Sequence, residues 1–267
     1  MKILLLANKD IASNLALNTL FQTITGSHEF QILLSSSVGK NTQNKPQSLI
    51  DLAFFEQALF NQILFPALTN TPSPTTGKYL SFAGLKTRGI EVSQIQSINS
   101  QAGIKTINDF GPDLIVSIRY GSILQAEVIG IPKFGVINLH SGELPTYRGV
   151  MATFRAMQRD DTECGTTVHY IIDSGIDSGE IISISKQTLD YQRSYLYNTL
   201  SLYETGIKDV VNAITQIQNT GTCVSYPANS QGNYFSFPCE QELEEFKQRG
   251  HKLYEYRDVI DIAQSYY

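Results

Sequence analysis

The chain has 267 residues, of which 42% are hydrophobic and 17% are charged. This composition can bury a sizeable core, so it excludes a disordered or collagen-like chain. The formal net charge of −5 argues against a general electrostatic attraction to nucleic acid or to anionic membranes.

The cysteines and the apolar segments exclude further classes of protein. The three cysteines, Cys164, Cys223 and Cys239, are odd in number and lie at no metal-ligand spacing, so we expect neither a disulfide framework nor a metal site. The longest apolar stretch, residues 49–68, is interrupted by charged and amide side chains, which argues against a membrane span. We therefore expect a cytoplasmic protein without a membrane partner.

The chain begins in the manner of a doubly wound α/β sheet. Residues 2–7 form a continuous apolar run, as expected of a strand that is buried on both faces. A polar turn follows at 8–10, and the apolar residues from Ile11 onward fall mostly on one face of a helix. Residues 30–34 are the predicted second strand. Strand, turn and helix in this order are typical of open α/β folds.

The segment 47–65 predicts a helix that is apolar nearly all round, with several phenylalanines such as Phe54 and Phe60. Such a helix is expected in the core or at a subunit contact. Residues 69–78, rich in proline and threonine, are the predicted loop after it.

The middle of the chain alternates between predicted helices and buried strands. We expect helices over 103–110 and 150–159, strands over 114–118, 134–139, 166–172 and 181–184, and a turn-rich loop over 173–179.

The character of the sequence changes after about residue 189. A long helix is predicted over 194–218, strand and turn signals over 221–238, and a short charged helix over 240–249. We therefore expect two parts: a catalytic α/β domain over residues 1–190, with a Rossmann-like, mostly parallel sheet, and a small C-terminal α+β region over residues 191–267.

A pair of chemically useful side chains ends one of the buried strands. Asn138 and His140 stand two residues apart, so they point to the same side at the carboxyl end of a strand, where open α/β sheets bind ligands. An amide N–H beside a protonatable imidazole can form an oxyanion site with a general acid or base. Taken alone, two residues favour the alternative, a polar strand end that caps the next loop.

The residues that follow extend this pattern. The block NLHSGELPTYRG is followed, after a strand, by the loop DSGIDSG. The two blocks together resemble the folate-dependent formyltransferase family over roughly residues 1–185. The matching positions are Asn138, His140, Leu144, Pro145, Tyr147, Gly149, Asp173, Asp177 and Gly179.

The resemblance implies a catalytic trio of Asn138, His140 and Asp177 and a formyl transfer from 10-formyltetrahydrofolate to an amine, without a metal. Asn138 and a protonated His140 would stabilise the negative charge on the formyl oxygen of the tetrahedral intermediate. Asp177 would keep His140 charged and oriented, and would assist proton removal from the amine through a water. The alternative for Asp177 is a turn aspartate that caps the backbone of its loop.

The resemblance also implies a folate site between two loops, which hold the pterin ring largely by backbone groups. The first loop, 119–124, would contribute Tyr120, Ile123 and Leu124, although Ile123 and Leu124 fit an ordinary core equally well. The second loop would contribute Ile172, Asp173, Ser174 and Gly175.

The loop after the first strand bears on the acceptor. Glycinamide ribonucleotide formyltransferases have a glycine-rich loop there that ends in Ser-Asn and binds a phosphate; here Ser13 and Asn14 are present, but residues 9–12 contain no glycine. A helix N-terminus can still receive an anion, and the alternative is that both residues cap the helix. The candidate acceptor-binding residues, including three cations for a diphosphate, are Lys9, Ser13, Asn14, Arg119, Tyr147 and Arg148.

The C-terminal region distinguishes among the members of the family. It is shorter than the tail of methionyl-tRNA formyltransferases, and its last predicted helix is acidic, which argues against a nucleic-acid partner. The size of the chain is most similar to the sugar N-formyltransferases, so we expect a nucleotide-linked, thymidine diphosphate amino sugar as the acceptor. Glycinamide ribonucleotide, methionyl-tRNA and a non-catalytic ligand-binding role remain as alternatives. We expect a homodimer, formed through the helix at 49–65 or the tail.

Overall fold

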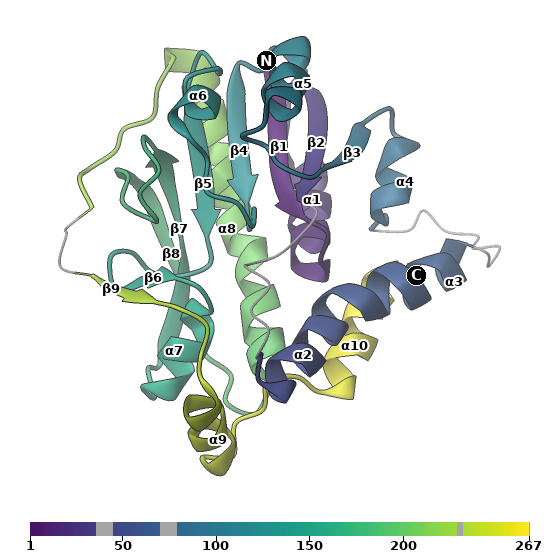
Figure 1. The fold of residues 1–267 in the computed structure, drawn as a ribbon, viewed down its shortest axis with the longest axis vertical. Coiled ribbons are helices and arrows are strands. Elements are labelled where there is room, and N and C mark those ends of the chain that lie inside the picture. The colour runs from purple at the N-terminus through teal and green to yellow at the C-terminus, as the bar shows by residue number, and fades with distance from the viewer. Residues whose placement is uncertain (36–44, 70–78, 229–231, 267) are drawn as a thin grey trace.

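The computed structural model describes residues 1–35, 45–69, 79–228 and 232–266. Its centre is a sheet of seven strands in the order β3-β2-β1-β4-β5-β7-β8 (Figure 1). The strands from β3 to β5 are parallel, and β7 and β8 are antiparallel to their neighbours, so the predicted Rossmann-like, mostly parallel sheet is confirmed. The strands are β1 (Lys2–Asn8), β2 (Glu29–Ser35), β3 (Glu91–Ile95), β4 (Leu114–Ile118), β5 (Val136–His140), β7 (Glu163–Ile171) and β8 (Ile181–Thr188).

The burial of each strand explains how readily it is predicted from the sequence. In β1 the side chains of Leu4 and Leu6 pack on one face of the sheet and those of Ile3 and Leu5 on the other, so the strand is a continuous apolar run. The edge strand β3 has the sequence EVSQI, in which only Val92 is buried, and sequence analysis did not predict it. An edge strand needs few apolar residues because solvent covers much of it.

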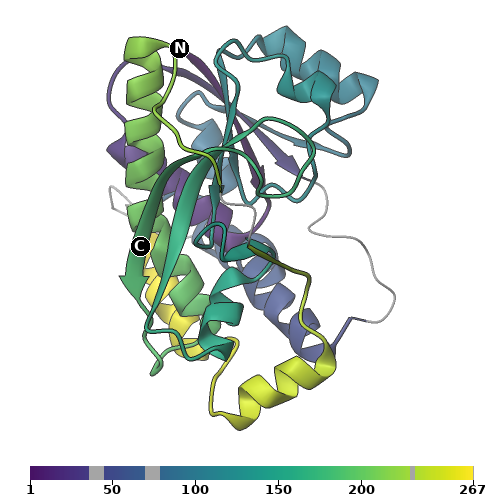
Figure 2. The ribbon, with the colours of Figure 1, turned by 90° about the vertical axis from the view of Figure 1, so that its left-hand side faces the viewer.

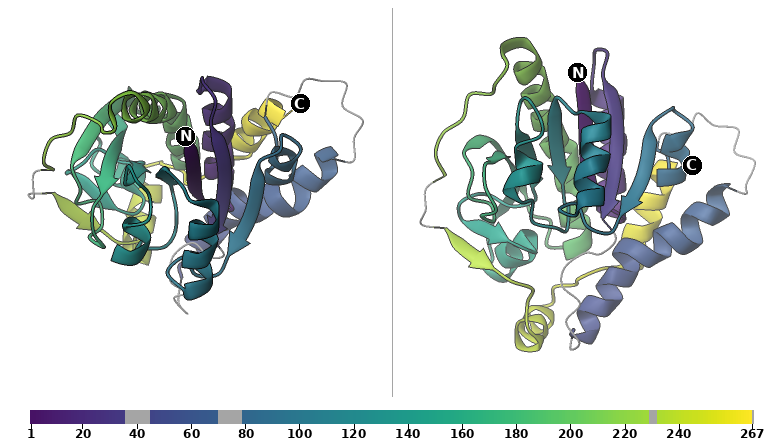
Figure 3. Two further views of the ribbon diagram at one scale, coloured as in Figure 1. Left: turned by 90° about the horizontal axis from the view of Figure 1, so that it is seen from above. Right: turned by 45° about the horizontal axis from the view of Figure 1, so that its top comes forward.

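Helices cover both faces of the sheet. α1 (Ile11–Thr23) and α8 (Tyr195–Thr220) lie on one face, whereas α5 (Gln101–Phe110) and α6 (Ala126–Ile129) lie on the other (Figures 2 and 3). α8 begins after the N-cap Ser194 and ends at Gly221, whose φ of 82° suits a glycine. Because α8 packs on α1 and β7, a division at residue 190 would separate the sheet from one of its covering helices; the two-part organisation stays a prediction.

The apolar segment at 47–65 is helical but only partly buried. It consists of α2 (Gln47–Ala53), the π-helix η1 (Phe54–Leu64) and α3 (Phe65–Thr69), which lie past the ends of β1 and β2 (Figure 1). Phe60 is 1% exposed, whereas Phe54 and Ile63 are 43% and 51% exposed. The described residues of the chain therefore cover only part of this helix, and the alternative of a subunit contact stays a prediction. The predicted loop at 69–78 lies outside the described residues beyond Thr69.

The remaining elements are short. A small second sheet joins β6 to β9 in parallel, and this ties the loop after β5 to the C-terminal region. The remaining short elements are α4 (Phe82–Lys86), β6 (Tyr147–Gly149), α7 (Ala152–Gln158), β9 (Asn233–Phe235), α9 (Glu240–Gln248), α10 (Tyr256–Ala263) and the 3₁₀ turn η2 (Gln264–Tyr266).

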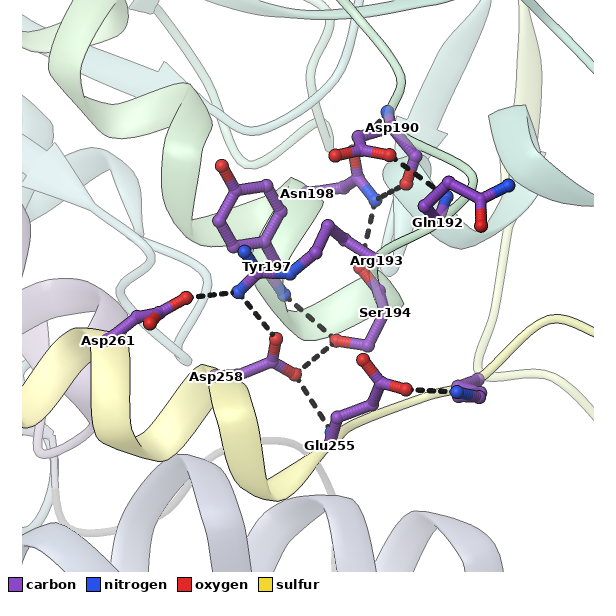
Figure 4. Close-up of polar contacts among 10 residues, drawn as sticks. Asp190, Gln192, Arg193, Ser194, Tyr197, Asn198, Glu255, Asp258 and Asp261 are labelled. Carbon is purple, nitrogen blue, oxygen red and sulfur yellow. Dashed lines mark hydrogen bonds and ion pairs between the residues drawn. The ribbon is translucent and has the colours of Figure 1, made fainter.

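A buried ion cluster attaches α10 to the start of α8 (Figure 4). Arg193 donates to Asp258 at 3.2 Å and to Asp261 at 2.5 Å. The other oxygen of Asp258 accepts the Ser194 hydroxyl at 2.5 Å and the Glu255 N–H at 2.8 Å. Ser194 caps α8, so one carboxylate holds both helix beginnings together.

Among the residues that the structure describes, no helix combines the length and the apolar character needed to cross a membrane.

Candidate active site

The end of β5 presents Asn138 and His140 on one face of the sheet. This is the face away from α1 and α8, because the intervening Leu139 packs in the core on the α1 and α8 side. The antiparallel pairing of β5 with β7 places His169 opposite Asn138 and Thr167 opposite His140. Two imidazoles and an amide therefore lie close together near the carboxyl end of β5.

Asp177 comes from the loop between β7 and β8 and completes the group. Its Oδ1 lies 3.5 Å from His140 Nδ1 and 3.6 Å from His169 Nε2, and its Oδ2 accepts the Gly149 N–H at 2.8 Å. Burial alone would raise the pKa of the Asp177 carboxyl, but the charge of His140, the neighbouring ring of His169 and the hydrogen bond from the Gly149 N–H lower it well below its usual range. Asp177 is therefore an anion held between two imidazoles.

Two hydrogen-bond acceptors flank the ring of His140. Its Nε2 donates to the Tyr147 carbonyl at 2.6 Å, and its Nδ1 faces the Asp177 carboxylate. These two contacts fix the orientation of the imidazole. Gly142 is required beside the ring, since a Cβ at that position would lie 2.5 Å from His140 Nε2.

His169 is a member of the group that sequence analysis assigned to structure alone. Its Nδ1 donates to the Tyr170 carbonyl at 2.9 Å, which leaves Nε2 to accept from the Asn138 amide at 3.1 Å. Both nitrogens are satisfied, as expected of a structural histidine, yet the ring also orients Asn138 and contacts Asp177. In the sequence it alternates with apolar neighbours, and only the strand register reveals the contact.

Two predicted acceptor-binding residues support the loops instead. Arg148 donates through Nε and Nη2 to the Ile176 carbonyl, at 3.1 Å and 2.7 Å, and so fixes the residue that precedes Asp177. The buried Tyr147 ring directs its hydroxyl at Asp161, while its carbonyl meets His140. In this structure both residues position the candidate catalytic side chains.

The two predicted folate loops present one exposed isoleucine each. Ile123 is 50% exposed and Ile172 is 63% exposed, so either can contact a flat ring. Leu124 is 4% exposed and packs with Tyr120 and Val136 in the core beneath them, which matches the alternative of ordinary core for Leu124. Val136 shares the face of Asn138, so this core lies on the same side of the sheet as the candidate site.

The second folate loop has a local turn. The Asp173 carboxylate accepts the Gly175 N–H at 2.7 Å, and Ser174 is exposed. A Cβ on Gly175 would lie 2.4 Å from the Ser178 hydroxyl, so a larger residue there would displace that side chain. The backbone between Asp173 and Gly175 is open to solvent, as a site that binds by backbone groups requires.

The loop after β1, where an acceptor phosphate was considered, differs from the expectation. Asp10 is the N-cap of α1, and its Oδ1 accepts the Ser13 N–H at 2.7 Å, so a carboxylate already occupies that helix N-terminus. Ser13 and Asn14 are both 0% exposed, and Asn14 accepts a hydrogen bond from Tyr266. The expectation that these two side chains bind the acceptor or cap the helix is corrected, because the turn is buried beneath the C-terminus.

Arg119 is also engaged within the chain. Its guanidinium lies 3.3 Å from Asp10, 3.6 Å from Glu56 and 3.4 Å from the Tyr203 hydroxyl. Arg119 is therefore paired within the chain, most closely with Asp10, and its φ of 57° places it at a sharp bend before Tyr120. Of the predicted cations, Lys9 is exposed, and within the described part of the chain no carboxylate lies at ion-pair distance from it.

We expect Glu56→Gln to change how stability depends on pH. Burial is the largest influence on the Glu56 pKa and raises it from 4.5 to about 7, against the attraction of Arg119. Between these values the folded chain holds a proton that the unfolded chain has released, so stability falls as pH rises through 7. The loss is on the order of 3 kcal/mol. Urea unfolding should show the variant and the wild type alike at pH 5, and the variant more stable at pH 8.

A matched control for this prediction is Glu204→Gln, which removes an exposed carboxylate paired with Lys208 at 3.1 Å. Its pH dependence should follow that of the wild type. Parallel stability curves for wild type and Glu56→Gln would contradict the assignment of a protonated carboxyl to this position.

Comparison with known proteins shows what this chain is similar to. Residues 68–198 match the model of the formyl transferase family. A methionyl-tRNA formyltransferase from Ehrlichia ruminantium (strain Gardel) is 30% identical over 202 residues, which are 73% of this chain and 59% of that protein. The match with a methionyl-tRNA formyltransferase from Kosmotoga olearia covers 30% of that protein, so the chain spans less than two thirds of the curated relatives.

Solved structures share the fold. A formyltransferase from Anoxybacillus kamchatkensis, in complex with UDP-4,6-dideoxy-4-formamido-L-AltNAc and tetrahydrofolate, is 20% identical with a TM-score of 0.52, covering 98% of this chain and all of its own. Glycinamide ribonucleotide transformylase 1 from Symbiobacterium toebii is 12% identical with a TM-score of 0.57, covering 86% of this chain and 94% of its own. Within the described residues no group of three or more acidic, histidine or cysteine side chains is placed to hold a metal ion.

Proposed function

We propose that this chain, which carries a formyl transferase domain, transfers a formyl group from 10-formyltetrahydrofolate to a primary amine. One observation carries the proposal: the Asp177 carboxylate lies between His140 and His169, beside the Asn138 amide, at the carboxyl edge of the sheet. The match to the family model supports it, as does the tetrahydrofolate bound by the formyltransferase from Anoxybacillus kamchatkensis.

The geometry suits addition followed by elimination at the formyl carbon. The free amine forms a new C–N bond, and the carbonyl oxygen becomes negative in the tetrahedral intermediate. The Asn138 amide and the imidazolium of His140 stabilise that oxygen. The amine then loses a proton to a water that Asp177 positions, and this proton is passed on to the folate nitrogen. The bond from the formyl carbon to the folate nitrogen breaks, and that nitrogen takes up a proton. His169 holds the Asn138 amide in place throughout.

The folate donor is proposed to bind between the two loops that flank this group. Ile123 and Ile172 supply exposed apolar surface for the pterin ring, and the turn at 173–175 supplies open backbone groups. Tyr120 lies at the start of the first loop and packs on the core beneath it. The arrangement would place the formyl group next to His140.

For the acceptor we propose a nucleotide-linked amino sugar, with thymidine diphosphate as the nucleotide. The negative net charge and the exposed glutamates of α9 favour a small molecule over tRNA. The curated relatives are methionyl-tRNA formyltransferases, so methionyl-tRNA is the second candidate, and glycinamide ribonucleotide is the third. A cytoplasmic homodimer is part of the proposal and rests on the sequence.

The test is a screen of amines with the purified protein and 10-formyltetrahydrofolate. Products are analysed by mass spectrometry for the gain of one formyl group on thymidine- and uridine-diphosphate amino sugars, glycinamide ribonucleotide and methionyl-tRNA. We expect formylation of a nucleotide-linked sugar. Formylation of only methionyl-tRNA or glycinamide ribonucleotide would overturn the acceptor, and no formylation of any amine would overturn the activity.

A further inference from the structure

The short strand β6 makes two of the contacts that hold the candidate catalytic side chains. Its Tyr147 carbonyl accepts from His140 Nε2 at 2.6 Å, and its Gly149 N–H donates to Asp177 Oδ2 at 2.8 Å. Main-chain atoms of one strand therefore fix both members of the pair. A strand of three residues is not stable by itself, so its place depends on what it pairs with.

The partner of β6 comes from the C-terminal region. β9 pairs with it in parallel, with Phe235 opposite Gly149 (Figure 1). The Phe235 carbonyl also accepts the Val150 N–H at 3.0 Å. A Cβ on Gly149 would lie 2.1 Å from the Phe235 carbonyl oxygen, so the two backbones are in direct contact. A shift of β9 would therefore move the residue that donates to Asp177.

A buried arginine anchors the end of β9. Arg155, on α7, is 5% exposed, and its two terminal nitrogens pair with the two carboxylate oxygens of Glu242. The same guanidinium donates to the Ser236 carbonyl at 3.2 Å, one residue after β9. It also lies 5.2 Å from the centre of the Phe235 ring, within the range of a cation–π contact. A bidentate pair of this kind fixes direction as well as distance.

Glu242 connects the following helix to this anchor. Its Oε2 accepts the N–H of Cys239, the N-cap of α9, at 2.8 Å. The hydrogen bond from Arg155 is the largest influence on the Glu242 pKa and lowers it. Within the described residues Glu242 is the carboxylate at ion-pair distance from Arg155. Its removal would leave a buried charge without a partner, so we expect the guanidinium to leave β9 for water.

We propose that Arg155 and Glu242 are positioning residues of the candidate active site. Through β9 and β6 they hold the Gly149 N–H on Asp177 and the Tyr147 carbonyl on His140. The effect on the rate rests on the proposed function, whereas the positioning is a property of the folded chain. The competing explanation is that the pair only attaches α9 to α7 and leaves the site unchanged.

The direct test reads the Gly149 amide by NMR in Glu242→Ala. Protein labelled with ¹⁵N-glycine and ¹³C-carbonyl arginine selects the glycine amides that follow an arginine, which are Gly89, Gly149 and Gly250. A charge-assisted hydrogen bond is short and moves the amide proton downfield. We therefore expect the Gly149 proton to move upfield in the variant. Gly89, which precedes β3 at the edge of the main sheet, is the internal reference.

The rate should follow the displacement. We expect kcat per folded molecule to fall by about 10-fold to 10²-fold in Glu242→Ala, because small displacements of catalytic groups cost rate. Arg155→Met removes the same link without leaving a buried charge, so it should fold and show the same shift of the Gly149 proton. Glu242→Gln keeps an amide oxygen that can accept from Arg155, so it should keep the Gly149 signal and most of kcat.

A matched control separates positioning from a loss of stability. Asp258→Ala removes a buried carboxylate of the C-terminal region whose hydrogen-bond partners lie at the starts of α8 and α10, away from β9. It should lower stability, yet in the folded protein the Gly149 proton should resonate as in the wild type.

The outcomes distinguish this inference from the proposed function. An unmoved Gly149 signal in both Glu242→Ala and Arg155→Met would overturn the positioning role, whatever the rate does. An equal shift in Asp258→Ala would also overturn it, because loss of stability alone would then explain the change. A shift confined to the two anchor variants, in a protein that formylates no amine, would support the positioning role and remove the formyl transfer.

Discussion

Replacing His140 with alanine is expected to reduce the rate of formyl transfer by on the order of 10³-fold or more, while the chain stays folded. A general acid or base contributes about 10²–10⁴-fold and an oxyanion donor about 10²–10³-fold, and His140 is proposed to supply both. Its ring is 8% exposed and contacts a carbonyl and a carboxylate, so the alanine also leaves the buried Asp177 without one partner, and the fold of the variant is measured separately. Single-turnover kinetics on a verified acceptor, with circular dichroism for the fold, measures the effect.

Two further variants show whether this loss is specific to the site. Asn138→Ala should cost about 2.7–4 kcal/mol of transition-state stabilisation if the amide is a single oxyanion donor. His28→Ala is the control, because His28 lies just before β2, at the opposite edge of the sheet, and bonds only locally to the Thr25 carbonyl. Near-normal rates in both site variants would exclude this group from catalysis.

Replacing Asp258 with alanine is expected to lower the free energy of unfolding by about 3–5 kcal/mol. The Asp258 carboxylate is 0% exposed and accepts from Arg193, from the hydroxyl of the cap Ser194 and from the Glu255 N–H. Its removal leaves Arg193, 9% exposed, with a charge that has lost its buried partner. Urea unfolding followed by circular dichroism gives the free energy.

The same cluster contains its own control. Asp261 also binds Arg193, but its side chain is 40% exposed, so Asp261→Ala should cost about 1 kcal/mol or less. If Asp258→Ala cost no more than Asp261→Ala, the buried carboxylate would not be what holds α10 to α8.

Local periodicity was enough to predict the central elements of this fold. The apolar runs of β1 and β4 identify strands covered on both faces, and the helix predicted over 194–218 corresponds to α8. The twofold repeat of a strand also places Asn138 and His140 on one face, without any knowledge of their neighbours. Each of these predictions depends only on residues close together in the chain.

Contacts between distant segments were decided by the tertiary structure. The antiparallel register brings His169 to Asn138, and the return of the loop after β7 brings Asp177 to His140. A periodic pattern within one strand contains no information on the contact between Asn138 and His169, which lie 31 residues apart in the chain. The resemblance to a family supplied Asp177, but it did not supply His169, which reads as an ordinary strand residue.

The ion pairing and the exposure of the charged and polar groups were likewise decided by the tertiary structure. Arg119 was predicted as a cation for the acceptor, yet it contacts Asp10 and Glu56 within the chain, and Glu56 comes from a helix more than sixty residues earlier. Asn14 was predicted to bind the acceptor or to cap the helix, yet it is buried and accepts a hydrogen bond from Tyr266 at the other end of the chain. Charge and exposure depend on what packs against a residue, and for these residues the partners lie far away in the sequence, so the three-dimensional structure alone determines them.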